Sequence, residues 1–278
     1  VDVGMKVGTF ARHGIDVQLT NFQGSSRMHQ AMVAGDIDIG VGAGPELVLI
    51  AKGSPELAVC DADPAAAFLG IAVPEGSPIR TIGDLRGKRL SVSSIGGLTY
   101  WLALELSRKQ GWGEHGLDLV AIGNASSSVV AALRTHNVDA AYTSTALAFL
   151  LEEKHEGRLL APATAYEGGV GAGMIFATKQ LIERNPDAIR RFLAGWLETI
   201  AYMRKNRAET VAIEAALTGF SPTVQAKEYD LTISMFDDDC RFDAESLDNL
   251  KRSFADLKLL PSPPDMAKLY TEAFLPKR

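Results

Sequence analysis

Hydrophobic and polar positions in the first part of the chain follow a strand–helix–strand pattern. Apolar residues alternate over residues 15–19 and again over residues 37–41, which predicts two half-buried strands. Between them, Met28, Ala31 and Met32 recur at the spacing of one helix face. Strands that alternate with helices at this spacing usually form parallel βαβ units, so the pattern predicts an α/β fold.

The same unit returns about one hundred residues further along the chain. The matching blocks are residues 10–17 with 112–119, residues 25–32 with 126–133, and residues 37–39 with 138–140. Their separations of 102, 101 and 101 residues differ by a single position, which a loop can absorb. Two copies of one unit predict two similar α/β lobes.

Two segments rich in glycine and proline bracket the second copy, residues 74–78 and residues 166–173. We expect them to form a two-segment hinge, so that the chain crosses twice between the lobes. Lobe 1 then consists of residues 1–73 and 174–278, and lobe 2, residues 79–165, is inserted into it. The predicted architecture is a pair of three-layer α/β lobes with mainly parallel sheets and a ligand cleft between them.

The chain after the second hinge segment is predicted to be mostly helical. Asn185 followed by Pro186 is typical of a helix cap with proline at the first helical position. An apolar stripe at helical spacing follows, which indicates a helix packed on a core. The stripe consists of Ile189, Phe192, Leu193, Trp196, Leu197, Ile200 and Met203.

The repeat also predicts a strand before the first residue. At the shift of 102, residues 1–10 correspond to residues 103–112, so the counterpart of residues 87–102 would precede Val1. We therefore expect the natural protein to carry about 15–20 further residues there, preceded by an export signal.

Charge and composition exclude some classes of partner. The chain has 28 Lys and Arg against 34 Asp and Glu, a net charge of −6, without a basic stripe, so we expect no nucleic-acid partner. No run approaches the roughly 18 apolar residues of a membrane span. Cys60 and Cys240 are too few for a disulfide framework, and both one bridge and two buried thiols remain open.

Five loops at the carboxyl ends of the predicted strands are small, hydroxylic or glycine-rich. Ligands of open α/β sheets bind at this edge, where helix N-termini favour negative charge and backbone N–H groups are free. Serine and glycine also serve as helix caps and turn residues there, which is the structural alternative. The candidate ligand-binding residues are Gln23, Gly24, Ser25, Gly44, Pro45 and Glu46 in lobe 1, and Ser93, Ser94, Gly97, Thr99, Asn124, Ser126, Thr143 and Ser144 in lobe 2.

Two further side chains bear on the chemistry of the ligand. Glu46 either compensates a helix dipole or faces the cleft as a carboxylate, which would favour a ligand with an amine or amide. Tyr166, beside the glycine-rich hinge segment, is a candidate for an aromatic wall.

Signals for catalysis are weak. Residues 40–45 imitate a dinucleotide-binding loop but lack its third glycine, and the five histidines have no zinc spacing. Residues 237–239 lack the glycine and the terminal glutamate of a calcium loop. We find no convergent acid, base and nucleophile, so we expect no catalytic residue, no metal, no cofactor and no enzyme activity.

Four short motifs resemble those of a known family. Residues 10–17 and 35–40 resemble the opening of solute-binding proteins of ABC importers, in the branch that binds taurine, aliphatic sulfonates and nitrate. Residues 78–88 resemble the family's entry to lobe 2, and residues 138–141 resemble one of its strands. The resemblance implies the type II periplasmic binding fold, hinge closure on a small ligand, and docking to a membrane permease.

The resemblance also implies where the protein acts and which residues bind. We expect a monomer in the periplasm, or anchored by lipid at the cell surface. By analogy, sulfonate binding falls on Ser94, Gly97 and Thr99, and the lobe 1 side of the cleft falls on Gly44, Pro45 and residues 23–25.

One departure from the family affects the ligand. Residues 143–145 are Thr-Ser-Thr where the family often has an acidic residue followed by proline, and no arginine falls in the cleft loops. We expect a small polar ligand, anionic (a sulfonate, nitrate or a taurine-like molecule) or heteroaromatic. The alternatives are a binding protein for a pyrimidine precursor of thiamine, a pyrimidine synthase-like enzyme on the same fold, and a sensor domain. The synthase would need a cysteine-rich iron motif, which two cysteines cannot form.

Overall fold

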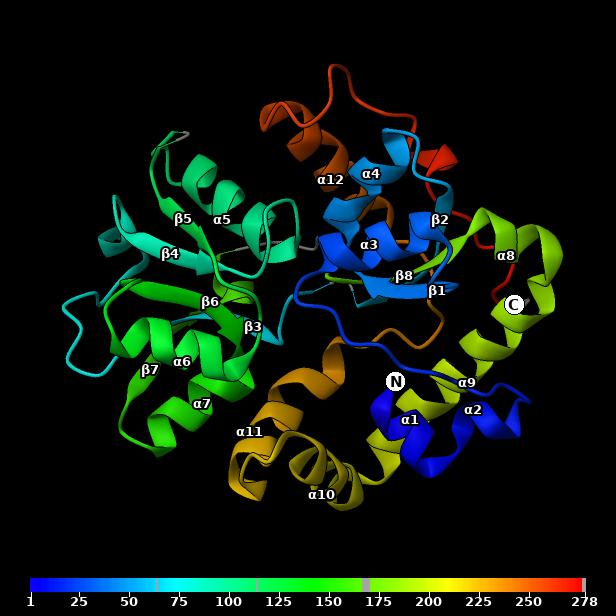
Figure 1. Cartoon of the computed structure of the whole chain (residues 1–278), viewed down its shortest axis with the longest axis horizontal. Helices are drawn as coiled ribbons and strands as arrows, with labels where there is room; N and C mark the ends of the chain where they lie inside the picture. The colour runs from blue at the N-terminus through cyan, green and yellow to red at the C-terminus, as the bar shows by residue number, and fades with distance from the viewer. Residues whose placement is uncertain (64, 114, 167–170, 277–278) are drawn as a thin grey trace.

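A computed structural model describes residues 1–63, 65–113, 115–166 and 171–276 (Figure 1). The strands are β1 (Ile39–Gly42), β2 (Glu56–Asp63), β3 (Leu69–Pro74), β4 (Arg89–Val92), β5 (Asp118–Ala121), β6 (Ala140–Ser144), β7 (Gly157–Pro162) and β8 (Gly173–Thr178). The α-helices are α1 (Asp2–Val7), α2 (Thr9–Arg12), α3 (Ser25–Ala34), α4 (Leu47–Ala51), α5 (Leu98–Lys109), α6 (Ser126–Arg134), α7 (Thr145–Glu153), α8 (Lys179–Arg184), α9 (Pro186–Lys205), α10 (Arg207–Thr218), α11 (Pro222–Thr232) and α12 (Ala244–Asp256). The 3-10 helices are η1 (Gly44–Glu46), η2 (Ile82–Leu85), η3 (Ala163–Ala165), η4 (Ile233–Met235) and η5 (Met266–Lys268).

The strands form two sheets, one in each lobe. The lobe 1 sheet has the order β1-β8-β2, and the lobe 2 sheet has the order β5-β4-β6-β3-β7. β8 lies antiparallel between β1 and β2, and β3 lies antiparallel between β6 and β7. The two sheets therefore share one arrangement, in which a reversed strand is inserted between two strands that run the same way.

The prediction of mainly parallel sheets is wrong in detail. β4 is parallel to β5 and to β6, as the βαβ pattern predicts, but every described pairing of β3 and β8 is antiparallel. The reason is that β3 and β8 each follow a crossover from the other lobe and enter their new sheet in the opposite direction.

The predicted lobe boundaries also need correction. β3 belongs to the lobe 2 sheet, so the first crossover lies between Asp63 and Leu69 and not at residues 74–78. Residues 74–77 instead form a turn at the end of β3, closed by a hydrogen bond from the Ser77 N–H to the Pro74 carbonyl. The second crossover joins β7 to β8, and residues 167–170 of the predicted hinge segment lie outside the described residues.

Residues 15–19 do not form the predicted strand. They have no regular secondary structure and no hydrogen-bonded ladder to any described strand, and together with β1 they line a cavity. Their repeat counterpart, β5, is held by its pairing with β4. Alternation of apolar residues predicts which side of a strand is buried, but a strand also needs a partner for its backbone groups.

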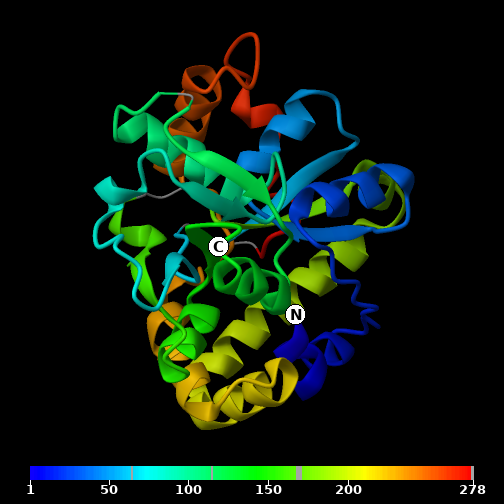
Figure 2. The ribbon, with the colours of Figure 1, turned by 60° about the vertical axis from the view of Figure 1, so that its left-hand side comes forward.

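The helix predicted after Asn185 is confirmed as α9. The Asn185 side chain accepts a hydrogen bond from the Ala188 N–H at 3.2 Å, and Pro186 occupies the first position. Its apolar stripe is buried against α2, where the rings of Phe10 and Phe192 stack at 5.0 Å. Gly195 allows this close approach, because a Cβ there would lie 2.7 Å from the Phe10 ring. Figure 2 shows α9, α10 and α11 together below the sheets.

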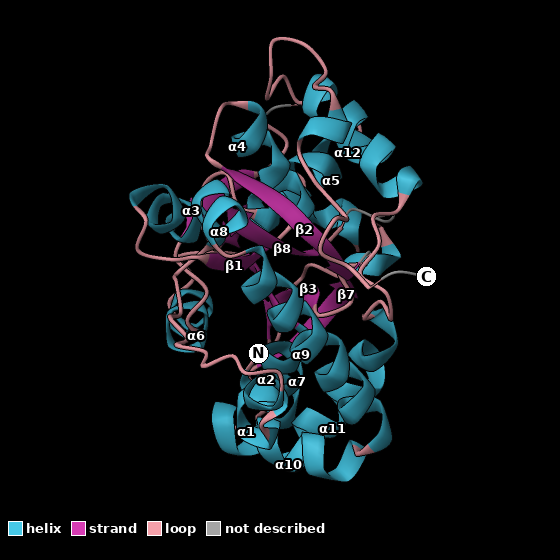
Figure 3. Ribbon diagram, turned by 90° about the vertical axis from the view of Figure 1, so that its right-hand side faces the viewer, coloured by secondary structure: helices cyan, strands magenta, loops and turns pink. Residues whose placement is uncertain are grey.

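The C-terminal part of the chain contacts both lobes rather than lobe 1 alone. α11 packs against α7 of lobe 2, and the Thr145 hydroxyl donates a hydrogen bond to Glu228 at 2.5 Å. α12 lies at the opposite end of the molecule (Figure 3), where Ser253 donates to the buried Glu105 of α5 at 2.9 Å. One hydrophobic core cluster accordingly includes residues of both lobes and α12.

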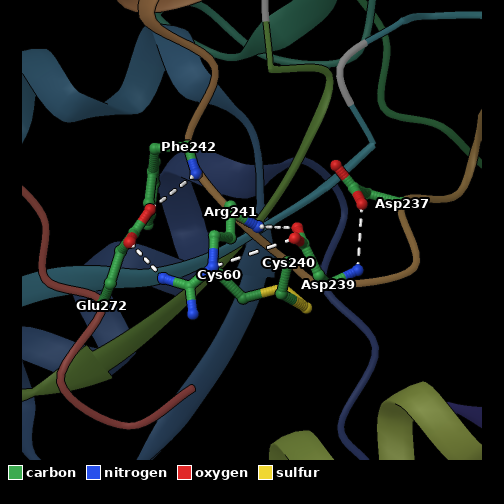
Figure 4. The surroundings of a disulfide bond; sticks show 7 residues. All are labelled: Cys60, Asp237, Asp239, Cys240, Arg241, Phe242 and Glu272. Carbon is green, nitrogen blue, oxygen red and sulfur yellow. Dashed lines mark hydrogen bonds and ion pairs between the residues drawn. A yellow bond between two sulfur atoms is a disulfide. The ribbon is translucent and has the colours of Figure 1, made fainter. Parts of the chain in front are cut away.

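A disulfide ties the C-terminal segment to the lobe 1 sheet (Figure 4). Cys60 lies in β2 and Cys240 lies between η4 and α12, 180 residues later. Beside it, the Asp61 N–H donates to the Cys240 carbonyl at 3.0 Å, and Arg241 pairs with Glu272. The structure thus selects the bridge from the two alternatives that the sequence left open. Among the described residues, no helix is both long and apolar enough to cross a membrane.

We predict that removal of the disulfide strongly lowers the free energy of unfolding. The bridge closes a loop of 180 residues, and the loop-entropy model gives about 5 kcal/mol for a loop of that size as an upper value. The measurement is denaturant unfolding of the wild type and of a Cys60→Ser/Cys240→Ser double variant, each with and without dithiothreitol. Dithiothreitol should lower the unfolding midpoint of the wild type only. Equal midpoints for the oxidised and the fully reduced wild type would contradict the prediction.

Candidate functional site

A cavity of about 1140 Å³ opens between the lobes and continues along the free edge of β1. Its interlobe part is lined from lobe 1 by the start of α3 and the end of β1, and from lobe 2 by the β4–α5 loop and the end of β6. These are the strand ends and helix starts at which the sequence predicts a ligand site.

The lobe 2 wall is rich in hydroxyl groups, and two of them also accept hydrogen bonds from the backbone. Thr99, buried in the first turn of α5, accepts a hydrogen bond from the Ser93 N–H at 2.9 Å. Ser144 accepts one from the Leu147 N–H at 3.2 Å and so begins α7. Ser93, Thr99, Asn124, Tyr142, Thr143 and Ser144 all line the cavity. The structural and the ligand-binding interpretations therefore apply to the same residues.

The lobe 1 wall is more apolar. Gly24, Ser25 and Glu46 line it as the sequence predicts. Several apolar lining residues are not predicted from the sequence, because their position depends on how the two crossovers bring the lobes together. Phe22, Met28 and Ala172 line the cavity from lobe 1. Phe68, in the first crossover, and Leu69, at the start of β3 in lobe 2, also line it.

Several predicted residues contact the opposite lobe directly. The Gln23 side-chain oxygen accepts hydrogen bonds from the N–H groups of Asn124 and Ala125 at 3.3 and 3.2 Å. These two N–H groups lie at the start of α6. The Gln23 amide therefore takes the position that an anion would favour at that helix N-terminus.

The start of α3 makes a second interlobe contact, with the β4–α5 loop. Ser26 donates a hydrogen bond to the Ile95 carbonyl at 2.9 Å. A Cβ on Gly24 would lie 2.5 Å from the Ser94 hydroxyl, and one on Gly97 would lie 3.0 Å from the Ser25 hydroxyl. Gly24 and Gly97 are thus positions where the backbone of one lobe closely approaches the other lobe. Because the two lobes are in direct contact, the structure represents a closed state.

Seven predicted residues do not line the cavity. Three of them, Gln23, Ser94 and Gly97, lie at the interlobe contacts described above. The other four lie elsewhere. Gly44 and Pro45 are buried in η1 beneath the lobe 1 wall. Ser126 lines a separate shallow pocket between α6 and α7. The Tyr166 ring lies 6.4 Å from the ring of Tyr142, which does line the cavity.

A buried histidine between two glutamates supports the lobe 1 wall. His29 Nε2 lies 2.8 Å from Glu46 Oε2, and His29 Nδ1 lies 2.9 Å from Glu56 Oε1. Glu46 Oε2 also accepts from the Ala43 N–H at 2.9 Å. The three side chains are 3% exposed or less. Burial alone would lower the pKa of His29, but the hydrogen bonds and charges of the two carboxylates outweigh it and raise the pKa to about 9.

The sequence analysis missed His29, because its partners are 17 and 27 residues away and meet it only in the folded chain. Glu46 was predicted either to compensate a helix dipole or to face the cleft. It lines the cavity, and its contacts are with a backbone N–H and the histidine.

The cavity has an acidic character. Among the described lining residues there is no lysine, arginine or histidine. The carboxylates along it are Asp2, Asp16, Asp36, Asp38 and Glu46. Within the part of the chain that the structure describes, no group of three or more His, Cys, Asp and Glu side chains could hold a metal ion.

Two α/β lobes that are joined by two crossovers, with loops of both lobes meeting over a cleft, define a protein of the periplasmic-binding-protein fold. The chain belongs to the NMT1/THI5-like family, whose pattern it matches over residues 3–210. The resemblance drawn from the four sequence motifs is thereby confirmed at the level of family and fold.

Solved structures share this fold at low sequence identity. The chain is similar to the alkanesulfonate-binding protein SsuA from Xanthomonas axonopodis pv. citri bound to MOPS, with a TM-score of 0.83, 20% identity, and 97% of this chain and 93% of that chain covered. The periplasmic aliphatic sulphonate binding protein SsuA from Escherichia coli is similar with a TM-score of 0.75 and 22% sequence identity. The comparison covers 97% of this chain and 94% of that chain. The desulfurization enzyme DSZB is similar with a TM-score of 0.70 and 16% sequence identity, and the comparison covers 98% of this chain and 93% of that chain.

Curated relatives are also distant. Proteins of Brucella abortus and Brucella suis, whose names give a binding role and no ligand, are 24% identical over 220 residues, which cover 77% of this chain. The chain spans 65% of the length of these relatives.

We predict that Gln23→Ala shifts the ligand-free protein toward an open state. The change removes two interlobe hydrogen bonds, and an exposed pair of this kind should change the ratio of open to closed protein by about fivefold. Small-angle scattering should show a larger radius of gyration. The control is Gln30→Ala, an exposed glutamine of α3. If both variants match the wild type, the Gln23 contact does not hold the lobes closed.

We predict that stability falls as the pH rises from 6.5 to 9. The pKa of His29 in the folded protein, about 9, exceeds its ordinary value of 6.5, so its stabilising effect is complete below pH 6.5 and is lost as the pH passes 9. The difference corresponds to about 3 kcal/mol. Burial also raises the pKa of Asp61 to about 7 and of Asp63 to about 8. Ionisation of these two carboxyl groups therefore destabilises the folded state, so they too lower the free energy of unfolding as the pH rises from about 4.

The measurement is the free energy of unfolding by urea at several pH values for the wild type and His29→Gln. The part of the slope that belongs to His29 should disappear in the variant, while the part from Asp61 and Asp63 remains. Identical slopes in the two proteins would show that folding does not raise the pKa of His29.

Proposed function

We propose that the protein is the solute-binding receptor of an ABC importer and holds a small polar solute between its lobes. The observation that carries this proposal is the interlobe cavity, which strand ends and helix starts of both lobes line. The family and the binding proteins among its fold neighbours support it. The proposed location is the periplasm, which the Cys60–Cys240 disulfide supports because such bonds persist in oxidising compartments.

The proposed mechanism is closure about the two crossovers. Among the described strands, the two sheets are joined directly in the sequence between β2 and β3 and between β7 and β8. A solute that contacts both walls does so only when the lobes are closed, so its binding shifts the population toward that state. The closed form is the one that a membrane permease would recognise.

The first candidate class of solute is a small oxyanion compound, such as a sulfonate, nitrate or a taurine-like molecule. The hydroxyl groups of Ser93, Thr143 and Ser144 on the lobe 2 wall support it, together with the adjacent start of α5. Hydroxyl and backbone N–H groups bind oxyanions without a cationic side chain.

A second candidate is a neutral heteroaromatic ring such as a pyrimidine. It is favoured by the aromatic lining residues Phe22, Phe68 and Tyr142 and by the lack of lysine and arginine among the described lining residues. A catalytic role is not proposed, since both cysteines are held in the disulfide and no nucleophile has a paired base at the cavity among the contacts described above.

We predict that one solute from a panel of sulfonates, nitrate, taurine and pyrimidines raises the melting temperature and compacts the protein. A ligand at about 100 times its Kd stabilises by about 2.7 kcal/mol, which thermal unfolding detects. Small-angle scattering of the same samples tests closure. A ligand that binds tightly without reducing the radius of gyration would rule out hinge closure, and a panel without any stabilising solute would contradict these two solute classes.

Matched variants place the solute in the cavity. Thr143→Val keeps the shape of a buried lining residue and removes its hydroxyl, so affinity should fall about tenfold. Ser126→Ala removes a hydroxyl from the shallow pocket between α6 and α7 and should leave affinity unchanged. If Ser126→Ala lowers the affinity and Thr143→Val does not, the solute binds in the pocket between α6 and α7 and not in the interlobe cavity.

A further inference from the structure

The cluster of His29, Glu46 and Glu56 has unbalanced charge. One imidazolium lies between two carboxylates, so the cluster carries one net negative charge in a region from which water is excluded. An unpaired charge in such a region is costly unless another group compensates it. Ser54 donates a hydrogen bond to Glu56 Oε1 at 2.7 Å but adds no charge.

Glu46 is the member of this cluster that borders the cavity. Its Oε2 accepts from His29 and from the Ala43 N–H, whereas its Oε1 has no hydrogen-bond partner. Glu56 Oε2 also has none, but Glu56 does not line the cavity. Among the described carboxylates that line the cavity, Glu46 is therefore the one with a buried oxygen that has no hydrogen-bond partner.

The sequence around Glu46 makes room for this arrangement. Gly42, at the end of β1, has no side chain, and a Cβ there would lie 2.1 Å from Glu46 Oε2. Any other residue at position 42 would displace the carboxylate. The glycine allows the side chain to lie under the end of β1, where both the histidine and the cavity are within reach.

No side chain of the cavity wall compensates the charge. The described lining residues include no lysine, arginine or histidine, and the lobe 2 wall opposite Glu46 presents hydroxyl groups. Glu46 Oε1 is itself buried, so an N–H group that pairs with it has to enter the wall beside Glu46, and a solute held in the cavity can supply such a group.

We infer that Glu46 is the specificity-determining residue of the cleft, and that it selects solutes with an N–H donor, an ammonium or an amidine-type amino group, at the lobe 1 end. His29 is a positioning residue, because it holds the other carboxylate oxygen. The solute's opposite end, an oxyanion or a ring acceptor, contacts the hydroxyl groups of Ser93, Thr143 and Ser144. This inference rests on the proposed receptor function.

The test compares solutes that differ in the donor alone. The probes are taurine against ethanesulfonate, and 4-aminopyrimidine against pyrimidine, measured by titration calorimetry on the wild type. The amino member of at least one pair should bind tenfold or more tightly than its partner, since a hydrogen bond to a charged group contributes about that much.

Two variants assign the preference to Glu46. Glu46→Gln keeps the size of the side chain and should reduce affinity for the amino member about tenfold, with less than about threefold change for its partner. Glu105→Gln is the control, a buried glutamate of α5 that pairs with Arg108 away from the cavity, and it should retain the preference. Melting temperatures confirm that both variants are folded. If Glu46→Gln does not fold, the test is the affinity difference between the amino member and its partner in each pair, measured on the wild type.

The outcomes separate this inference from the receptor function. Equal affinities within every pair that binds, or an unchanged preference in Glu46→Gln, would overturn the role of Glu46 and leave the receptor function standing. Binding only of panel solutes that lack an N–H donor would do the same. Absence of binding by every probe and every panel solute would overturn this inference together with the two proposed solute classes.

Discussion

The arrangement of both lobes depends on the backbone hydrogen bonds of two reversed strands. β3 is held between β6 and β7, and β8 is held between β1 and β2, each immediately after the chain has crossed from the other lobe. A strand in the middle of a sheet is paired on both edges, so each crossover is anchored at its far end. This turns the carboxyl ends of β1, β4 and β6 toward a common cleft and leaves two short connections as the points about which the lobes can move.

The C-terminal segment adds contacts that those crossovers alone do not provide. The Cys60–Cys240 bridge holds the segment to β2, α11 packs on α7, and α12 reaches Glu105 of α5. The C-terminal segment therefore contacts both lobes: β2 in lobe 1, and α5 and α7 in lobe 2. When the lobes move, these contacts must either be kept or be replaced by others. Closure therefore involves the C-terminal segment as well as the two crossovers.

The electrostatics of the cleft follow from what is buried beside it. His29 is charged because two carboxylates surround it, and those carboxylates outnumber it. In a region of low dielectric such an imbalance acts strongly on whatever enters the cavity. The opposite wall has hydroxyl groups that can either donate or accept. The two walls thus differ in chemistry, and a solute that meets both is oriented by that difference.

The sequence by itself determined the α/β class, the two similar units, the long helix after Asn185, and most of the loops that face the cleft. These follow from local periodicity and from helix caps such as Ser144, which depend on neighbouring residues. The tertiary structure alone decided the direction of β3 and β8, the first crossover between β2 and β3, the absence of a strand at residues 15–19 and the choice of a disulfide for the two cysteines. It also decided that Gln23 contacts α6 and that His29 joins Glu46 to Glu56. Each of these depends on partners far away in the chain, and a local pattern has no information about which distant group will satisfy a backbone hydrogen bond or a buried charge.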